Sequence, residues 1–223
     1  MEQCRIENLF DLKETITSEL FEGHTYPWEV LPLIGDFIRR LGETLSQEEY
    51  EKRGEDIWVA RSAVIFDTAY IAGPAIIGKE AQVRQGAFIR GNAIVGEGTV
   101  VGNSTELKNA ILFNKVQVPH FNYIGDSILG YRAHTGAGVI ASNVKLDKKP
   151  VVVKDGKEQI DTGLKKFGAM LGDFAEIGCN SVLNPGTVVG RNSIVYTLSS
   201  VRGVIPADSI YKNAAEIRER EQR

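Results

Sequence analysis

The stretch IFDTAYIAGPAIIGKEAQVRQGAFI, residues 65–89, has an aliphatic residue at every sixth position. An alanine follows four positions after Ile65, Ile71, Ile77 and Val83. The pattern continues in both directions through Val59, Val95, Val101 and Leu107, with the small residues Ala63, Ala93, Thr99 and Thr105. A period of six residues is typical of a parallel β-helix, in which three hexads make one triangular coil with the aliphatic residue inside. The sequence therefore predicts a mainly β protein, a left-handed parallel β-helix built on hexapeptide repeats.

The same period returns later in the chain. Its second run is led by Leu171, Ile177, Leu183, Val189, Val195 and Val201. Between the runs the register slips near Leu112, and the period vanishes between Asn143 and Phe167. Three valines and an Asp155-Gly156 pair within that gap predict a strand that enters a tight hairpin. We expect the β-helix over residues 59–205, with an ejected and functional loop at 144–166.

The segments that flank the repeats have a different pattern. Residues 15–21 and 28–41 are predicted to be helices, the second with apolar residues at three-to-four spacing on one face. Pro27 precedes this helix and Gly42 follows it. We interpret residues 1–58 as a helical N-terminal cap that plugs the open end of the solenoid. Residues 206–223 are expected to form a C-terminal tail, within which residues 213–223 are a charged helix or tail.

Composition excludes several classes of protein. The formal charge of −3 gives no electrostatic footprint for nucleic acid or an anionic membrane. No apolar run is long enough to span a bilayer, and the N-terminus lacks the layout of a signal peptide. Cys4 and Cys179 lie far apart and show no metal-binding spacing. These features predict a cytoplasmic protein with neither a nucleic-acid nor a membrane partner.

Few side chains could act as a general base near neutral pH. The chain has three histidines, and His24 falls between the expected helices, outside the coils. His120 lies in an unusually polar repeat, whereas Arg90 and Lys108 are three hexads apart, which is one full coil, and should stack on one face. Two stacked cations predict a phosphate site. His120 and His134 are less than one coil apart, and this spacing argues against a zinc site.

Several motifs together resemble a known enzyme domain. They are residues 106–110 (ELKNA), 120–126 (HFNYIGD), 136–138 (GAG), Asn143 and 165–169 (KKFGA). They are similar to the acetyltransferase domain of bifunctional N-acetylglucosamine-1-phosphate uridyltransferase/glucosamine-1-phosphate acetyltransferases, most of all the archaeal sugar-1-phosphate nucleotidyltransferase/acetyltransferase type. The resemblance covers residues 59–205. It implies a CoA-dependent N-acetyltransferase that uses acetyl-CoA and an amino-sugar phosphate such as glucosamine 1-phosphate. Residues 1–58 lack the Gly-rich phosphate loop of the nucleotidyltransferase domain, so uridyl transfer is not expected.

The resemblance also implies a role for individual residues. His120 would be the general base, and Arg90 and Lys108 would hold the sugar phosphate. Tyr123 and Asn143 would contact the sugar or the phosphate, with Lys149 approaching from a neighbouring subunit of a homotrimer. The coenzyme would be contacted by Gly136, Ala137, Gly138, Cys179 and Tyr196.

Three positions depart from the family pattern. His134 stands where the family has an asparagine, Cys179 where a serine is common, and Tyr196 where a small residue is usual. These departures leave open a second interpretation, a non-catalytic β-helix that binds a sugar phosphate or a partner protein. The identity of the amino sugar is also left open.

Overall fold

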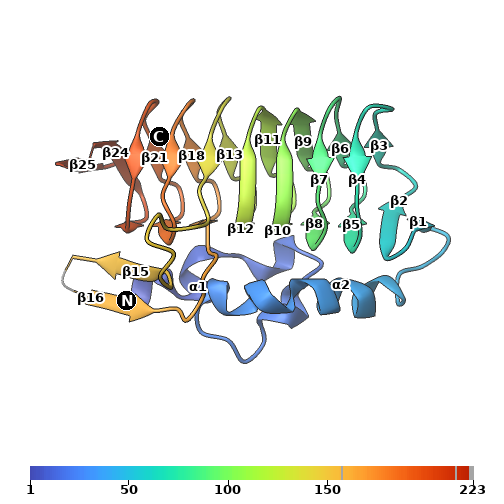
Figure 1. Cartoon of the computed structure of the whole chain (residues 1–223), viewed down its shortest axis with the longest axis horizontal. Coiled ribbons are helices and arrows are strands. Elements are labelled where there is room, and N and C mark those ends of the chain that lie inside the picture. Colours follow the sequence, from blue (N-terminus) through green and yellow to red (C-terminus); the bar gives the residue numbers. More distant parts are fainter. Residues whose placement is uncertain (157, 214, 221–223) are drawn as a thin grey trace.

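The computed structural model describes residues 1–156, 158–213 and 215–220, and its main body is a parallel β-helix (Figure 1). Most coils contribute one strand to each of three faces. Face 1 contains β2 (Ile57–Ala60), β5 (Ala75–Ile77), β8 (Ala93–Val95), β17 (Ala169–Leu171), β20 (Thr187–Val189) and β23 (Val204–Ile205). Face 2 contains β4 (Tyr70–Ile71), β7 (Phe88–Ile89), β14 (Ile140–Ala141), β19 (Val182–Leu183) and β22 (Ser200–Val201). The predicted β-helix is confirmed.

Two long strands join face 2 to face 1. β10 (Glu106–Leu112) and β12 (Tyr123–Leu129) each begin on face 2 and end on face 1. Face 3 is a separate sheet of β3 (Val64–Ile65), β6 (Gln82–Val83), β9 (Val100–Asn103), β11 (Gln117–His120), β13 (His134–Thr135), β18 (Glu176–Ile177), β21 (Ile194–Val195), β24 (Ser209–Asn213) and β25 (Glu216–Glu219). Face 3 meets face 2 at the corner where the chain turns from β11 into β12.

The slip in the repeat corresponds to two short coils. Ala75 pairs with Ala93, three hexads later, but Ala93 pairs with Ala110 and Ala110 with Ser127, each one position short of three hexads. The aliphatic positions still point inward, as shown by the full burial of Ile77, Val95, Leu112, Leu129, Leu171 and Val189. The missing position in each short coil is therefore absorbed at the corners, and the interior remains aligned.

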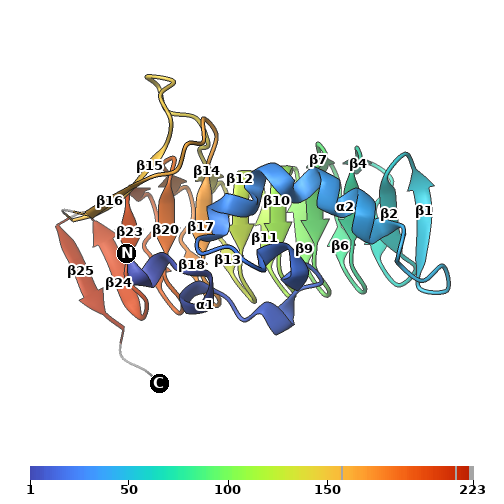
Figure 2. The ribbon, with the colours of Figure 1, turned by 90° about the horizontal axis from the view of Figure 1, so that it is seen from below.

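The N-terminal segment does not plug an end of the solenoid; instead it runs along face 1, so the predicted cap is wrong in its placement (Figure 2). We call residues 1–49 the strap. It consists of η1 (Glu2–Cys4), α1 (Ile6–Leu9), η2 (Leu12–Glu14), η3 (Ser18–Phe21), η4 (Pro27–Leu33) and α2 (Ile34–Gly42), where η marks a 3-10 helix. α2 packs on β5, β8 and β10, and η4 packs on β12.

The physical reason for this placement is a second apolar layer on face 1. Neighbouring residues of a strand point to opposite sides, so Ile76, Ile94, Ile111 and Ile128 point away from the interior. All four are nevertheless buried, at 0–1% exposure. A face that is apolar on its outer side must be covered, and the apolar stripe of the strap covers it.

Antiparallel hairpins finish both ends of the solenoid. β1 (Tyr50–Gly54) pairs with β2 at the first coil, and β25 pairs with β24 at the last. The expected C-terminal tail at 206–223, with a charged helix or tail from residue 213, is thus wrong for its described part, because β24 and β25 extend face 3. Residues 214 and 221–223 lie outside the described residues. The hairpin predicted in the ejected loop is confirmed as β15 (Val152–Asp155) and β16 (Glu158–Asp161). No helix among the described residues is long and apolar enough to cross a membrane.

Candidate functional site

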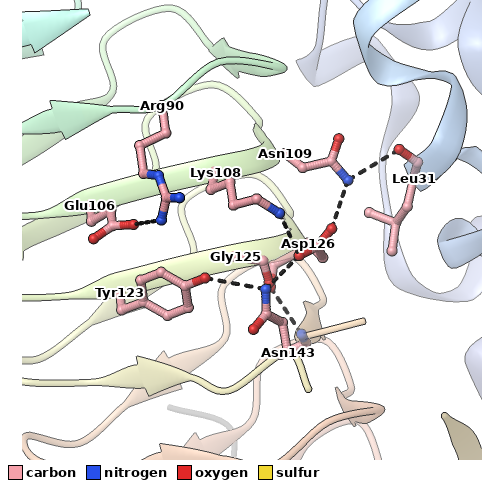
Figure 3. A network of polar contacts seen from close by, with 11 residues as sticks. Leu31, Arg90, Glu106, Lys108, Asn109, Tyr123, Gly125, Asp126 and Asn143 are labelled. Carbon is pink, nitrogen blue, oxygen red and sulfur yellow. Dashed lines mark hydrogen bonds and ion pairs between the residues drawn. The ribbon is translucent and has the colours of Figure 1, made fainter. Parts of the chain in front are cut away.

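Four of the predicted site residues lie close together where face 2 meets face 1 (Figure 3). Arg90 follows β7 and Lys108 lies in β10, one coil further along. Tyr123 begins β12, and Asn143 follows β14. The parallel register places these side chains on successive coils, which is the stacking that the three-hexad spacing of Arg90 and Lys108 predicted.

Each cation in this cluster is paired with a carboxylate. Arg90 Nη1 lies 2.6 Å from Glu106 Oε1, and both side chains are partly exposed. Lys108 Nζ lies 3.4 Å from Asp126 Oδ2, a carboxylate that is almost fully buried. The cations are thus held in place by neighbours rather than left free in solvent.

Asp126 is the centre of the cluster, and the sequence analysis did not single it out. Its Oδ2 faces Lys108 and accepts a hydrogen bond from the Asn143 amide. Its Oδ1 accepts a hydrogen bond from Asn109 Nδ2 at 3.0 Å, and the same amide donates to the Leu31 carbonyl at 3.2 Å. Glu106 and Asp126 both lie in the motifs that carry the family resemblance, and that was the available signal. The contact with Leu31 had no signal in the sequence.

The charges of the cluster set the protonation states of Tyr123 and Arg90. Burial raises the pKa of Tyr123, and the carboxylates of Asp126 and Glu106 raise it further, so the phenol stays neutral. Its hydroxyl accepts a hydrogen bond from the Asn143 amide at 3.2 Å. The hydrogen bond to Glu106 raises the pKa of Arg90 and keeps the guanidinium charged. A cavity of about 320 Å³ opens here, lined by Leu31, Pro32, Gly73, Arg90, Gly91, Asn92, Lys108, Asn109 and Asp126.

His120 does not join this cluster within one chain. It ends β11 on face 3, at the edge where face 3 meets face 2, and its side chain is exposed. Asp126 lies six residues later at the opposite edge of face 2. At about 3.3 Å per residue of extended chain, the width of the face, on the order of 15 Å, separates the two. Lys149 is also apart, in the exposed loop between β14 and β15, which projects from the solenoid (Figure 2).

The residues predicted to contact a coenzyme lie on the same edge as His120. Gly138 N donates to the His120 carbonyl at 3.0 Å, and Asn180 N donates to the Ala137 carbonyl at 2.8 Å. Leu198 N then donates to the Cys179 carbonyl at 2.9 Å. These bonds stack the turns of successive coils into one column, which we call the coenzyme edge.

The coenzyme edge is closely packed at Gly136 and carries an exposed aromatic ring at Tyr196. A Cβ on Gly136 would lie 2.7 Å from the Cys179 backbone nitrogen, so only glycine fits there. Tyr196 stands 47% exposed on the edge, with Lys212 Nζ 5.8 Å from its ring centroid.

His134, the residue that replaces the family asparagine, lies on face 3. Its Nδ1 is 2.7 Å from Glu176 Oε2, on the next coil. Among the described residues, no group of three or more histidine, cysteine, aspartate or glutamate side chains could hold a metal ion. His134 is therefore part of an exposed pair on the surface of the solenoid.

The fold and the cluster define a class: a hexapeptide-repeat β-helix with stacked cations on one face and a histidine on a glycine-containing edge. Residues 71–157 match the GMPPB C-terminal domain family. The chain is 36% identical over 117 residues to the bifunctional protein GlmU of Methanococcus aeolicus, covering 52% of this chain and 28% of that protein. The resemblance found in the sequence is thus confirmed.

A second archaeal relative and a solved structure are also similar to this chain. The bifunctional sugar-1-phosphate nucleotidylyltransferase/acetyltransferase of Sulfurisphaera tokodaii is 31% identical over 96 residues, 43% of this chain and 24% of that protein. The chain thus spans about a quarter of the length of these archaeal relatives. A hexapeptide transferase family protein from Anaplasma phagocytophilum superposes with a TM-score of 0.42 and 19% identity, covering 74% of this chain and 79% of that one.

Proposed function

We propose that this protein is an acetyl-CoA-dependent N-acetyltransferase that acts on an amino-sugar 1-phosphate such as glucosamine 1-phosphate. The observation that carries the proposal is the stacking of Arg90 and Lys108 beside Tyr123 and Asn143. Two cations one coil apart match a phosphate group, and a neutral phenol and an amide beside them match sugar hydroxyls. The similarity of 117 residues of this chain to the bifunctional protein GlmU of Methanococcus aeolicus supports the same substrate class.

The chemistry assigned to the edge is acyl transfer. His120 accepts a proton from the sugar amine as the amine nitrogen forms a bond to the thioester carbonyl carbon. Backbone N–H groups of the coenzyme edge, near Gly136 and Gly138, stabilise the negative charge that develops on the carbonyl oxygen. The C–S bond then breaks, and the proton held by His120 passes to the departing thiolate to give coenzyme A.

The distance between His120 and Lys108 in one chain leads to a shared site. We propose a homotrimer in which the His120 edge of one copy faces the Arg90–Lys108 face of the next, with Lys149 reaching across. Apolar side chains stand exposed on face 2 and on this edge: Tyr70 (63%), Phe88 (40%), Phe121 (60%) and Val182 (37%). Such a surface is typical of one that is covered by a partner.

The test is coenzyme A release from acetyl-CoA with glucosamine 1-phosphate as acceptor. We expect turnover by the unaltered protein and a loss of about 100-fold or more in kcat for His120→Ala, the usual size of a general-base effect. His24→Ala, which alters a histidine of the strap, is the matched control and should keep full activity. Full activity in His120→Ala would refute the mechanism, and a particle mass of 24.5 kDa rather than three times that value would refute the shared site.

A second candidate is a non-catalytic β-helix that binds a sugar phosphate or a partner protein. The observation that favours it is the exposed Tyr196 ring, which stands on the coenzyme edge. Calorimetry distinguishes the two: heat with glucosamine 1-phosphate but none with acetyl-CoA or coenzyme A would support this candidate.

A further inference from the structure

We propose that Asn109 is a positioning residue of the acceptor site, through which the strap sets the geometry of Lys108 and Asn143. The inference rests on the proposed function, because the acceptor phosphate is the ligand of that site. It adds to the mechanism a residue that lines the acceptor cavity and acts through Asp126 rather than on the reacting groups. It also gives the strap a part in substrate binding.

The two carboxylate oxygens of Asp126 contact different groups. Asn109 Nδ2 donates to the Leu31 carbonyl of η4 and to Asp126 Oδ1. The other oxygen, Oδ2, accepts the Asn143 amide and faces Lys108 Nζ. Figure 3 shows this chain of contacts from Leu31 to Asn143. The strap is therefore two hydrogen bonds away from the carboxylate that orients the phosphate-binding lysine.

The local backbone suits this arrangement. Asn109 has φ of 50° and Asp126 has φ of 47°, the left-handed region in which asparagine and aspartate are the best tolerated residues after glycine. The carboxylate torsion of an aspartate is broad, so its plane is set by hydrogen bonds rather than by its own rotamer. Without the Asn109 amide, Oδ1 would lose its donor and the plane could turn, which would move the oxygen that faces Lys108.

The strap also reaches the site directly. Leu31 and Pro32 of η4 line the cavity of about 320 Å³ together with Arg90 and Lys108. The same short helix thus supplies one wall of the cavity and the carbonyl that anchors Asn109. Asn109 is not among the residues assigned to the coenzyme, which lie on the coenzyme edge of the neighbouring copy in the proposed trimer. A change at Asn109 should therefore affect the acceptor and leave the coenzyme unaffected.

The test compares Asn109→Gly with Asn114→Ser. Glycine keeps the left-handed backbone and removes the amide. Asn114 also contacts the strap, donating to Glu14 Oε2 at 3.4 Å, but it does not line the acceptor cavity. For Asn109→Gly we expect the KM for glucosamine 1-phosphate to rise by about 10-fold, the size of a lost hydrogen bond to a charged group, with an unchanged KM for acetyl-CoA. For Asn114→Ser both KM values should stay unchanged.

A second variant guards against a failure of Asn109→Gly to fold. Asn109→Asp keeps the size of the side chain but places a carboxylate beside Asp126. Its KM for the acceptor should rise by at least as much, and the rise should shrink at a pH low enough to protonate the new carboxyl. An unchanged acceptor KM in the folded variant, or an equal rise in both KM values, would overturn the positioning role.

Binding of inorganic phosphate, measured by calorimetry, separates this inference from the proposed function. If the unaltered protein binds phosphate but transfers no acetyl group, the proposed function fails. About 10-fold weaker phosphate binding by Asn109→Gly would then still support the positioning role. Equal phosphate affinity in the two proteins, or no phosphate binding by either, would overturn it.

Discussion

The guanidinium of Arg191 lies 2.6 Å from the fully buried carboxylate of Asp173, one coil earlier in the chain. The same carboxylate accepts hydrogen bonds from the backbone amides of Asp11 and Tyr131, each at 2.8 Å. Asp11 belongs to the strap, and Tyr131 and Arg191 belong to coils on either side of Asp173. One side chain therefore joins three parts of the molecule.

We predict that Asp173→Ala lowers the free energy of unfolding by about 2–4 kcal/mol, because two backbone amides lose their acceptor in a buried place. Urea unfolding followed by circular dichroism measures the loss. Asp147→Ala, which removes an exposed loop carboxylate paired with Lys145, is the control and should change stability by no more than about 0.5 kcal/mol. An equal effect of the two substitutions would contradict the role of Asp173.

The free energy of unfolding should depend on pH through the titration of the Asp173 carboxyl. Burial raises the pKa of Asp173 above its usual value of 3.8, although two backbone amides and Arg191 act in the opposite direction. The folded chain then holds the proton to a higher pH than the unfolded chain. The stability linked to that proton is fully present below pH 3.8 and is lost as the pH rises through the raised pKa.

The matching measurement compares the unaltered protein with Asp173→Asn, which does not titrate. We expect the stability of the unaltered protein relative to Asp173→Asn to fall as the pH rises above 3.8 and through the raised pKa of Asp173. Urea midpoints at several pH values provide the comparison. A relative stability that rises with pH would mean that the pairing with Arg191 outweighs burial.

Lys108→Met should weaken acceptor binding. The substitution removes a cation and leaves the Asp126 carboxylate to repel a phosphate, so we expect kcat/KM for the acceptor to fall about 100-fold, mainly through KM. Lys79→Met is the matched control, since Lys79 pairs with Glu49 on the first coils, away from the cavity. An unchanged acceptor KM in Lys108→Met would remove Lys108 from the phosphate site.

The two cysteines should differ sharply in reactivity. Burial raises the pKa of the Cys4 thiol to about 12, so almost no thiolate forms at pH 8. Cys179 is exposed on the coenzyme edge. Mass spectrometry after brief treatment with iodoacetamide should show one label, at Cys179, and a second only after unfolding. Rapid labelling of Cys4 in the native protein would contradict the packing of the strap.

Much of the solenoid could be predicted because the aliphatic residue at every sixth position marks a strand that faces the interior. Val95 and Leu112 mark the interior whatever lies outside it, so the coils and the slip followed from the spacing. The hairpin followed from the valines and the Asp155-Gly156 pair in the gap. The strap was misplaced because the six-residue period of the inward aliphatic residues gives no information about the adjacent residues, which point outward. Ile76 and Ile94 are as apolar as the inward residues beside them, and this second layer marked face 1 as a covered surface.

The site could be predicted in part for a similar reason. Stacking follows from spacing, which is why Arg90 and Lys108 were placed correctly on one face. Distance across a face does not follow from a period, so the separation of His120 from Lys108 needed the structure. Asp126 sits at a corner where the repeat sets no residue type, and the carbonyl of Leu31 reaches it from a segment outside the repeat.

The route of the strap has a consequence for how the chain folds. A solenoid ordinarily forms coil by coil, with contacts only between neighbours in the chain. Here the Leu9 carbonyl accepts a hydrogen bond from Asp173 N, and the strap also contacts β5, β8, β10 and β12. Residues 1–49 leave the ribosome before any coil, yet they find their complete binding surface only after residue 173 has been made. Docking of the strap is therefore a late, long-range step, and it turns a linear array of coils into one cooperative unit.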